Sequence, residues 1–215
     1  GWPTEKMIVI GVTGTKGKTS TANFIWASLN YAGLKTGLIG TANIENGKEE
    51  LLNIYHMTMP SPFILQKLLS QMVSNKCQAT VIETTSEGIK QWRHKGIIYD
   101  IAVFTNLTPE HIPSHGSFEN YRAMKQKVFQ ELSSSFRKTV SGRKIPKVIV
   151  ANVDSAEAPN FLKFASDKKI TFGLSSAADI KAENIEEKDS GLEFKIKNQS
   201  IKLMLLGKFN ALNAL

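Results

Sequence analysis

Met7–Thr19, with the sequence MIVIGVTGTKGKT, decides the fold of this 215-residue chain. Its first six residues are apolar and rich in β-branched side chains, which is typical of a strand buried on both faces in a parallel sheet. A glycine-rich turn follows, and the residues from Thr19 to about Tyr31 suit a helix, with Gly33 as its stop. Such a turn points backbone N–H groups and the positive end of a helix at an anion, so we predict a phosphate-binding loop.

Elsewhere in the chain, short apolar runs alternate with amphipathic segments, as a doubly wound parallel sheet requires. Beyond Gly173 the pattern changes to apolar residues alternating with charged ones, which predicts an antiparallel hairpin. We therefore predict an α/β fold: a P-loop-containing, mostly parallel doubly wound sheet with flanking helices and a small antiparallel β extension near the C-terminus. The expected elements are strands at Thr36–Ile39, Ala79–Glu83, Ile101–Phe104 and Val148–Ala151, helices at Pro62–Ser74 and Phe118–Leu132, a polar loop through Asn46 and Gly47, and the hairpin residues Leu192, Phe194, Ile196, Ile201, Leu203 and Leu205.

The composition limits the classes of partner and compartment. The chain has 27 Lys and Arg against 19 Asp and Glu, a net charge of +8 that favours anionic ligands such as nucleotides. The basic residues are scattered, so we expect no nucleic-acid partner. Cys77 is the single cysteine, which excludes an intrachain disulfide and a multi-cysteine zinc site. Without a segment of membrane-span length or a signal-peptide pattern, we expect a cytoplasmic protein. We also expect a monomer.

One dense basic run stands out from this scatter. Its basic residues lie among serine and glycine, so we interpret the run as a solvated surface loop. They are Arg137, Lys138, Arg143, Lys144 and Lys147.

The chemistry of the glycine-rich loop follows from two of its side chains. Lys18 would reach the β- and γ-phosphates of a nucleotide, and the Thr19 hydroxyl would bind Mg²⁺. The general Walker pattern has glycine where this chain has Val12, so the loop is a variant. A tight turn without a ligand is the alternative, and the position of the motif between a buried strand and a helix favours phosphate binding.

Glu83 ends another predicted strand. Its carboxylate would lie at the carboxyl edge of the sheet, where open α/β sheets bind ligands, and it could hold Mg²⁺ there. An ordinary acid at a strand end is the alternative interpretation.

The loop sequence carries a family resemblance. Residues 11–21, GVTGTKGKTST, resemble the ATP loop of the Mur ligases and folylpolyglutamate synthetases, which form amide bonds with release of ADP. Folylpolyglutamate enzymes usually carry a different residue at the position of Thr19, which favours the cell-wall branch. The resemblance implies that nucleotide binding involves Gly14, Thr15, Lys16, Gly17, Lys18, Thr19 and Ser20.

A second stretch, residues 104–125, strengthens this resemblance. It is similar to the Mur ligase segment that supplies an adenine-side asparagine, a metal-binding histidine and a lysine carbamylated by CO₂, which match Asn106, His111 and Lys125. Carbamylation would convert the Lys125 cation into an anion able to bind Mg²⁺. The resemblance thus implies ATP, one or two Mg²⁺ ions and a catalytic set of Lys18, Glu83, His111 and Lys125. A structural histidine and a solvated helix lysine are the alternatives.

The acceptor side departs in part from the family pattern. Residues 56–60, HMTMP, occupy the place of a Thr-Thr-Pro motif that contacts the muramoyl substrate in the branch adding the third residue of the peptide stem. Thr58 remains and Met59 replaces one threonine. Ser86 and Arg93 match further substrate-binding positions, whereas Glu87 departs from the histidine common there. For Arg93, a plain surface charge is an equally weighted alternative.

The end of the chain, residues 206–215, resembles the Gly-x-Phe/His-Asn-x-x-Asn motif that closes the Mur ligase central domain, with Asn210 and Asn213 near the nucleotide. We therefore expect residues 1–215 to form the central, ATP-binding domain, without the N-terminal UDP-binding and C-terminal amino-acid-binding domains. Alone, this fragment would be inactive.

The parent enzyme would phosphorylate a UDP-muramoyl-peptide carboxylate, and an amino-acid amine would attack the acyl phosphate to form a peptidoglycan precursor. A non-catalytic nucleotide-binding module is one alternative. Another Mur-like ligase, of the folylpolyglutamate, poly-glutamate or cyanophycin type, is a second. A generic P-loop kinase or GTPase ranks lowest, because it should show a strand-borne aspartate or a guanine-specificity motif.

Overall fold

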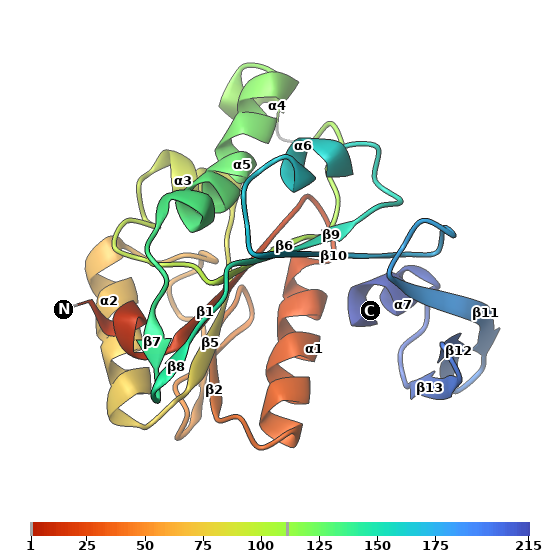
Figure 1. Ribbon diagram of the computed structural model, residues 1–215, viewed down its shortest axis with the longest axis horizontal. Coiled ribbons are helices and arrows are strands. Elements are labelled where there is room, and N and C mark those ends of the chain that lie inside the picture. The colour runs from red at the N-terminus through yellow and green to blue at the C-terminus, as the bar shows by residue number, and fades with distance from the viewer. Residues whose placement is uncertain (1, 111) are drawn as a thin grey trace.

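The computed structural model describes residues 2–110 and 112–215, which are organised around one twisted sheet (Figure 1). Among the described residues, the strands of this sheet follow the order β13-β12-β11-β10-β9-β6-β1-β5-β2-β3-β4. The neighbouring strands from β10 to β2 pair in parallel, which confirms the predicted mostly parallel sheet. Their bounds are β1 Ile8–Thr13, β2 Thr36–Ile39, β5 Ala79–Glu83, β6 Ile101–Phe104, β9 Val148–Asn152 and β10 Lys168–Gly173.

Strand β1 occupies the switch point of the sheet. It pairs with β5 from Ile8↔Ala79 to Val12↔Glu83 and with β6 on its other side. The chain passes from β1 through α1 (Lys18–Tyr31) to β2 and later returns to place β5 between them, whereas β6, β9 and β10 lie on the opposite side. Ligands of open α/β sheets bind where the strand order reverses in this way. The carboxyl ends of β1, β5 and β6 therefore mark the expected site.

Helices cover both faces of the sheet. Successive residues of β1 point to opposite faces, and since both sets are apolar, each face needs helices packed against it. Val9 packs in the larger cluster with side chains of α2 (Pro62–Ser74) and α5 (Phe118–Ser134). Ile10 packs on the other face, against α1. The short helices are η1 Pro3–Lys6, α3 Ser86–Lys90, α4 Ile112–His115, α6 Ala158–Leu162 and α7 Phe209–Ala214.

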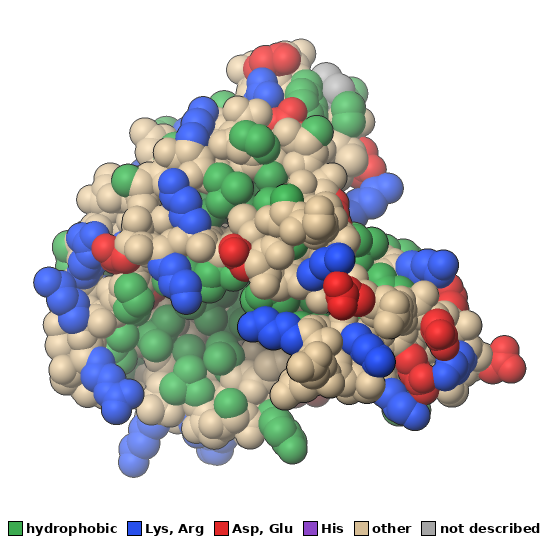
Figure 2. Space-filling view, turned by 45° about the vertical axis from the view of Figure 1, so that its right-hand side comes forward, with side chains coloured by type: hydrophobic (Ala, Val, Ile, Leu, Met, Phe, Trp, Pro, Cys, Tyr) green, Lys and Arg blue, Asp and Glu red, His purple; other side chains and the backbone are tan. Residues whose placement is uncertain are grey.

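An apolar groove of about 330 Å³ remains on the α1 face, lined by residues of α1, α7 and the sheet. Figure 2 shows hydrophobic side chains gathered in a hollow of the surface, with charged side chains over the C-terminal part of the chain. None of the described helices combines the length and the apolar composition of a membrane-spanning segment.

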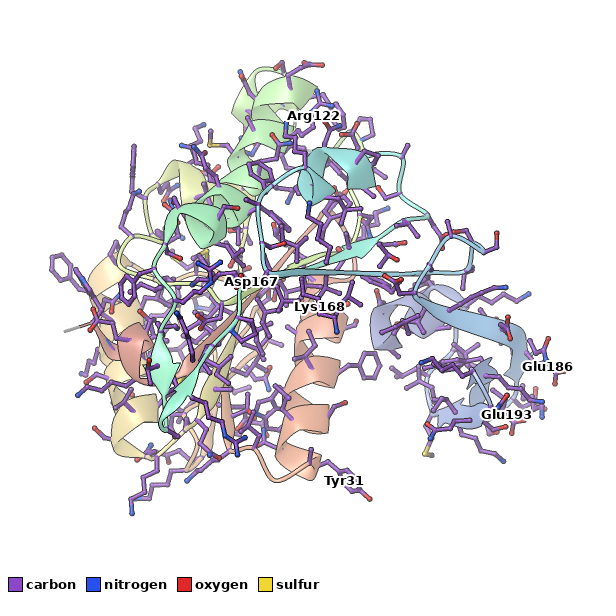
Figure 3. All side chains as sticks on the ribbon, viewed as in Figure 1. Tyr31, Arg122, Asp167, Lys168, Glu186 and Glu193 are labelled. Atoms are coloured by element: carbon purple, nitrogen blue, oxygen red, sulfur yellow. The ribbon has the colours of Figure 1, made fainter. Side chains whose placement is uncertain are left out.

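The predicted antiparallel extension is confirmed. Strands β12 (Gly191–Ile196) and β13 (Gln199–Leu203) form the hairpin, and β11 (Ile180–Lys188) adds a third strand that reaches β10. The extension has its own small core around Leu192 and Phe194. Figure 3 shows Glu186 and Glu193 on this extension, to one side of the main sheet. The alternation of apolar and charged residues was therefore a reliable indicator of a sheet with one solvated face.

Three strand regions differ from expectation. The predicted loop through Asn46 and Gly47 is the turn of a hairpin between β3 (Asn43–Glu45) and β4 (Glu50–Leu52), which extends the sheet at its edge. These strands are too short to show an alternating pattern. Strand β10 was not predicted because its first two residues are exposed lysines. A separate small sheet consists of β7 (Thr139–Val140) and β8 (Arg143–Lys144).

The interpretation of the basic run as a solvated loop is wrong for Lys138 and Lys147. Both side chains are buried, and their ammonium groups lie 2.5 Å and 3.2 Å from the two oxygens of buried Asp100. Burial lowers the pKa of Lys138 to about 8, although Asp100 opposes the shift. The Lys138 ammonium also donates to three backbone carbonyls, of Thr4, Met7 and Ile98. These contacts join the N-terminal turn η1 to the sheet.

Candidate active site

The glycine-rich loop is held against the end of β6 by a network of hydrogen bonds. The Asn106 amide accepts from the Lys16 N–H at 2.9 Å and donates to the Lys16 carbonyl at 3.0 Å. The Thr105 hydroxyl donates to the same carbonyl at 2.8 Å. The Thr15 N–H donates to the Asn106 carbonyl at 2.9 Å. Asn106 therefore fixes the loop backbone in this structure.

Two glycines of the loop have no room for a side chain. Gly17, at the start of α1, has a φ of 79°, and a Cβ atom there would lie 2.2 Å from Oδ1 of Asn213. A Cβ atom on Gly14 would lie 2.0 Å from the Thr105 hydroxyl oxygen. The loop therefore brings its backbone close to neighbouring segments at both positions, which only glycine permits.

The two lysines of the loop have different environments. Lys18 donates to the Thr15 carbonyl at 2.9 Å, and burial lowers its pKa while Glu83 and Glu110 oppose the shift. The Lys16 side chain is 74% exposed and forms an ion pair with Glu110 at 3.1 Å. Lys18 is thus the lysine that points into the interior of the site.

Glu83 is buried at the end of β5 and accepts several hydrogen bonds. The Thr19 hydroxyl lies 3.0 Å and 3.1 Å from its two oxygens. The N–H and hydroxyl of Thr41 donate to one of these oxygens at 3.0 Å and 2.8 Å. Glu83 and Thr19 fit a Mg²⁺ site, because this ion binds one or two carboxylates together with hydroxyl and phosphate oxygens. Among the described residues, no group of three or more His, Cys, Asp and Glu could hold a metal by itself.

Lys125 is a buried residue of α5, so its interpretation as a solvated helix lysine is wrong. Its ammonium nitrogen lies 2.6 Å from the Gly14 carbonyl oxygen and 4.6 Å from the centre of the Tyr121 ring. Burial, with a smaller effect of Lys18, lowers the pKa of Lys125 to about 7. The Tyr121 hydroxyl is hydrogen-bonded to that of Thr15 at 3.2 Å. The predicted histidine ligand, His111, lies outside the described residues.

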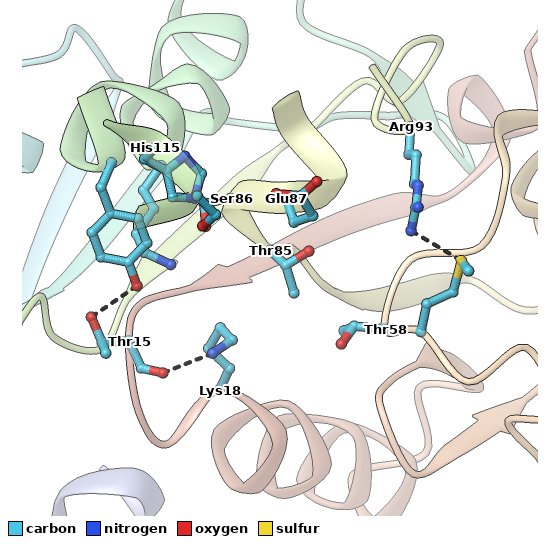
Figure 4. A pocket seen from close by; sticks show the side chains of 12 residues that line it. Thr15, Lys18, Thr58, Thr85, Ser86, Glu87, Arg93 and His115 are labelled. Carbon is cyan, nitrogen blue, oxygen red and sulfur yellow. Dashed lines mark hydrogen bonds between the residues drawn. The ribbon is translucent and has the colours of Figure 1, made fainter. Parts of the chain in front are cut away.

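A cavity of about 520 Å³ brings the predicted transfer and acceptor residues together. Figure 4 shows Arg93 and His115 on opposite sides of this cavity, with Lys18 and Thr58 along the edge between them. Arg93 donates to the Met59 carbonyl at 2.6 Å and contacts the Met57 sulfur at 3.0 Å, so here it holds the loop that carries Thr58. The cavity is lined by Thr15, Lys18, Met57, Thr58, Thr85, Ser86, Glu87, Arg93, Ser114, His115, Tyr121 and Lys125.

A second cavity, of about 510 Å³, lies on the other side of the phosphate loop. Its lining combines amide and aromatic groups, which suits a planar heterocycle with hydrogen-bonding edges. Of the two predicted C-terminal asparagines, Asn213 lines this cavity, whereas Asn210 accepts a hydrogen bond from Asn213 at 3.1 Å. The lining residues are Lys16, Gly17, Ser20, Thr105, Asn106, Thr108, Asn152, Phe172, Phe209, Leu212 and Asn213.

Thr41 and Asn152 are site residues that sequence reasoning missed. Each lies at or just beyond the carboxyl end of a buried strand, β2 and β9 respectively. Glu83 was predicted from the same kind of position, at the end of a buried strand, whereas Asn106 was predicted from the family resemblance. Phe172 belongs to the unpredicted strand β10 and carried no such signal.

Comparison with known proteins places this geometry in a family. The family model of the Mur ligase middle domain matches residues 12–215. A UDP-N-acetylmuramoyl-L-alanyl-D-glutamate--2,6-diaminopimelate ligase of Bacillus cereus is 34% identical over 221 residues, covering 100% of this chain and 43% of that protein. A UDP-N-acetylmuramyl-tripeptide synthetase of a Roseiflexus species is 35% identical, covering 100% of this chain and 44% of that protein. The chain thus spans less than half the length of these relatives.

Solved structures agree with this result. The structure of a UDP-N-acetylmuramoyl-L-alanyl-D-glutamate--2,6-diaminopimelate ligase has a TM-score of 0.81 and 27% identity, covering 97% of this chain and 42% of that one. A MurF ligase of Thermotoga maritima in complex with ADP has a TM-score of 0.65 at 16% identity, covering 97% of this chain and 43% of that one, and shows the shared fold. Since the family model spans the phosphate loop, both cavities and the C-terminal motif, this chain belongs to the Mur ligase middle-domain family.

Proposed function

We propose that this chain is the nucleotide-binding middle part of an ATP-dependent, ADP-forming amide ligase that acts on a UDP-muramoyl-peptide carboxylate in peptidoglycan precursor synthesis. One observation carries the proposal: the phosphate loop lies between two cavities, and Lys18 and Lys125 line the cavity that also contains Thr58, Ser86 and Arg93. A γ-phosphate held by Lys18 would face the acceptor residues. The names of the relatives support the branch that adds the third residue of the peptide stem.

The proposed reaction has two steps. A carboxylate oxygen of the acceptor attacks the γ-phosphorus, the bond to the bridging oxygen breaks, and ADP leaves with the formation of an acyl phosphate. The amino group of the incoming amino acid then attacks the acyl carbon, phosphate leaves, and the nitrogen loses a proton as the amide forms. Phosphoryl transfer depends mainly on positioning and electrostatic stabilisation.

Each part of the loop has a role in that first step. The backbone N–H groups from Gly14 to Ser20 would bind phosphate oxygens, and the Lys18 ammonium would offset their charge. Thr19 and Glu83 would hold Mg²⁺, which supplies further neutralisation of the transferred phosphoryl group. The buried position of Glu83 beside the Thr19 hydroxyl supports this assignment.

Lys125 is proposed to become carbamylated. An uncharged amine adds to CO₂, a nitrogen–carbon bond forms, and the amine proton is released, which leaves an anionic carbamate. The lowered pKa of Lys125 supports this reactivity, because a larger fraction of the amine is uncharged near neutral pH. With the anion in place, Lys125 and the predicted ligand His111 would offer a place for a second Mg²⁺ ion.

The second cavity is proposed to bind the adenine ring. Asn213 and the aromatic residues Phe172 and Phe209 lie beside the loop on this side, and Asn210 would act by orienting Asn213. Asn106 borders this cavity and would act by holding the backbone of Lys16. We also propose that the protein is cytoplasmic and monomeric; light scattering of the purified chain would test the oligomeric state.

An ADP-release assay on the full-length gene product that contains this chain tests the function. ADP should accumulate over many turnovers only when ATP, Mg²⁺, UDP-muramoyl-dipeptide and a suitable amino acid are all present. Tight ATP binding with no turnover for any amino acid would instead support a non-catalytic nucleotide-binding module. Turnover with a folate or poly-glutamate acceptor would assign the chain to another branch of the family.

A further inference from the structure

A chain of hydroxyl groups connects the acceptor loop with Glu83. The Thr41 hydroxyl oxygen lies 2.8 Å from Oε2 of Glu83 and 2.8 Å from the Thr58 hydroxyl oxygen. The Thr41 N–H also donates to Oε2, at 3.0 Å. Strand β2 pairs with β5 up to Ile39↔Ile82, so the sheet register places Thr41 beside Glu83. Thr58 in turn lines the cavity that contains Lys18 and Lys125.

The direction of these hydrogen bonds follows from the number of protons. A carboxylate only accepts, so the single hydroxyl proton of Thr41 is directed at Glu83. In the contact between the two threonines, Thr58 must therefore donate and Thr41 accept. Thr58 then offers only oxygen lone pairs to the cavity. It can receive an N–H or O–H donor of the acceptor substrate without losing its bond to Thr41.

A ligand that accepts a hydrogen bond from the Thr58 hydroxyl would instead break the hydrogen bond between the two threonines. The hydrogen bond from Thr41 to Glu83 would then weaken, since hydrogen bonds in a chain polarise one another. Thr58 lines the cavity, so a ligand bound there can compete for its contact with Thr41.

We propose that Thr41 is a positioning residue for Glu83, and that the acceptor-side residue Thr58 acts on Glu83 through it. Occupation of the acceptor side is then sensed at the magnesium side of the phosphate loop. This inference rests on the proposed function, because it assigns Mg²⁺ to Thr19 and Glu83 and the acceptor to the cavity at Thr58.

The test is a double-mutant cycle on nucleotide affinity, measured by calorimetry on this chain with ATP in excess Mg²⁺ and with ATP in EDTA. Thr41→Val should weaken binding of Mg·ATP about tenfold, as expected for loss of a hydrogen bond to a charged group, and leave binding in EDTA unchanged. Thr41→Ser, which keeps the hydroxyl, should restore the affinity. Thr58→Val should weaken Mg·ATP binding about threefold in the wild-type background and have no effect in the Thr41→Val background.

Two results would overturn the inference: an unchanged magnesium dependence in Thr41→Val, or an equal effect of Thr58→Val in both backgrounds. Thermal unfolding of each variant shows that the fold is kept, and Thr41→Ala provides the same comparison if the valine variant does not fold. A wild-type chain that binds no ATP would overturn the proposed function as well. Binding of Mg·ATP that Thr41→Val does not alter would overturn the positioning role alone.

Discussion

The ammonium nitrogen of Lys125 lies 2.6 Å from the carbonyl oxygen of Gly14, so helix α5 contacts the phosphate loop through a buried amine. Burial and the nearby charge of Lys18 lower the pKa of this amine from 10.5 to about 7. An ordinary solvated lysine is almost fully protonated at neutral pH. The pKa of Lys125 is therefore well below that of a solvated lysine, which its position on an amphipathic helix does not indicate.

We predict that Lys125 forms a carbamate whose amount rises with pH through about 7. Only the uncharged amine reacts with CO₂, and the fraction of uncharged amine increases as the pH rises past the pKa. Carbon-13 NMR under a fixed pressure of labelled CO₂, recorded between pH 6 and pH 8, should show a carbamate signal that grows with pH. Lys125→Met is the control and should lack the signal. An equal signal in that variant would place the carbamate on another lysine.

The two loop lysines provide a matched pair for nucleotide binding. Lys18→Ala should weaken Mg·ATP binding by roughly tenfold to a hundredfold, because it removes a charged donor to phosphate. Lys16→Ala should change the affinity by less than about threefold, because the Lys16 side chain is 74% exposed and pairs with Glu110 at the surface. Calorimetry on both variants makes the comparison. Unchanged affinity in Lys18→Ala would refute the phosphate-loop assignment.

The central sheet could be predicted because parallel strands that are buried on both faces have continuous apolar sequences. The strand Ala79–Glu83 and the helix Pro62–Ser74 were predicted with the bounds that the structure has. Strand β10 could not be recognised, since its exposed end begins with two lysines. In the site, Glu83 was predicted from its place at a strand end. Thr41 occupies a similar place, but threonine after a strand has many ordinary roles and only the sheet register brings it to Glu83.

The burial of Lys138 and Lys147 could not be predicted from the sequence for a different reason. Lys138 and Lys147 converge on Asp100, which precedes β6 by one residue, and neither their spacing nor their neighbours in sequence reveal that contact. A basic run among serines and glycines has the composition of a surface loop. The contact depends on three segments meeting in the folded chain.

We predict that Asp100→Asn destabilises the fold by about 3–5 kcal/mol, because it leaves Lys138 and Lys147 buried without their counter-charge. The free energy of unfolding in urea, measured with the wild-type chain alongside, checks this value. Lys202→Met is the control: it removes an exposed ion pair with Glu193 and should cost less than about 1 kcal/mol. A loss below about 1 kcal/mol in Asp100→Asn would show that the buried ions do not depend on this carboxylate.

The contacts of Asn106 in the structure differ from the role that the family resemblance implies. The family resemblance implies a contact on the adenine side, whereas here both groups of its amide are bonded to the backbone of Lys16. If Asn106 acts mainly by holding the loop, Asn106→Ala should weaken binding of Mg·ATP and of Mg·tripolyphosphate, which has no base, by the same factor. We expect about tenfold for each, since two hydrogen bonds that order the loop are lost. Competition calorimetry with both ligands measures the two factors. A tenfold loss for ATP with unchanged tripolyphosphate affinity would assign Asn106 to the adenine ring instead.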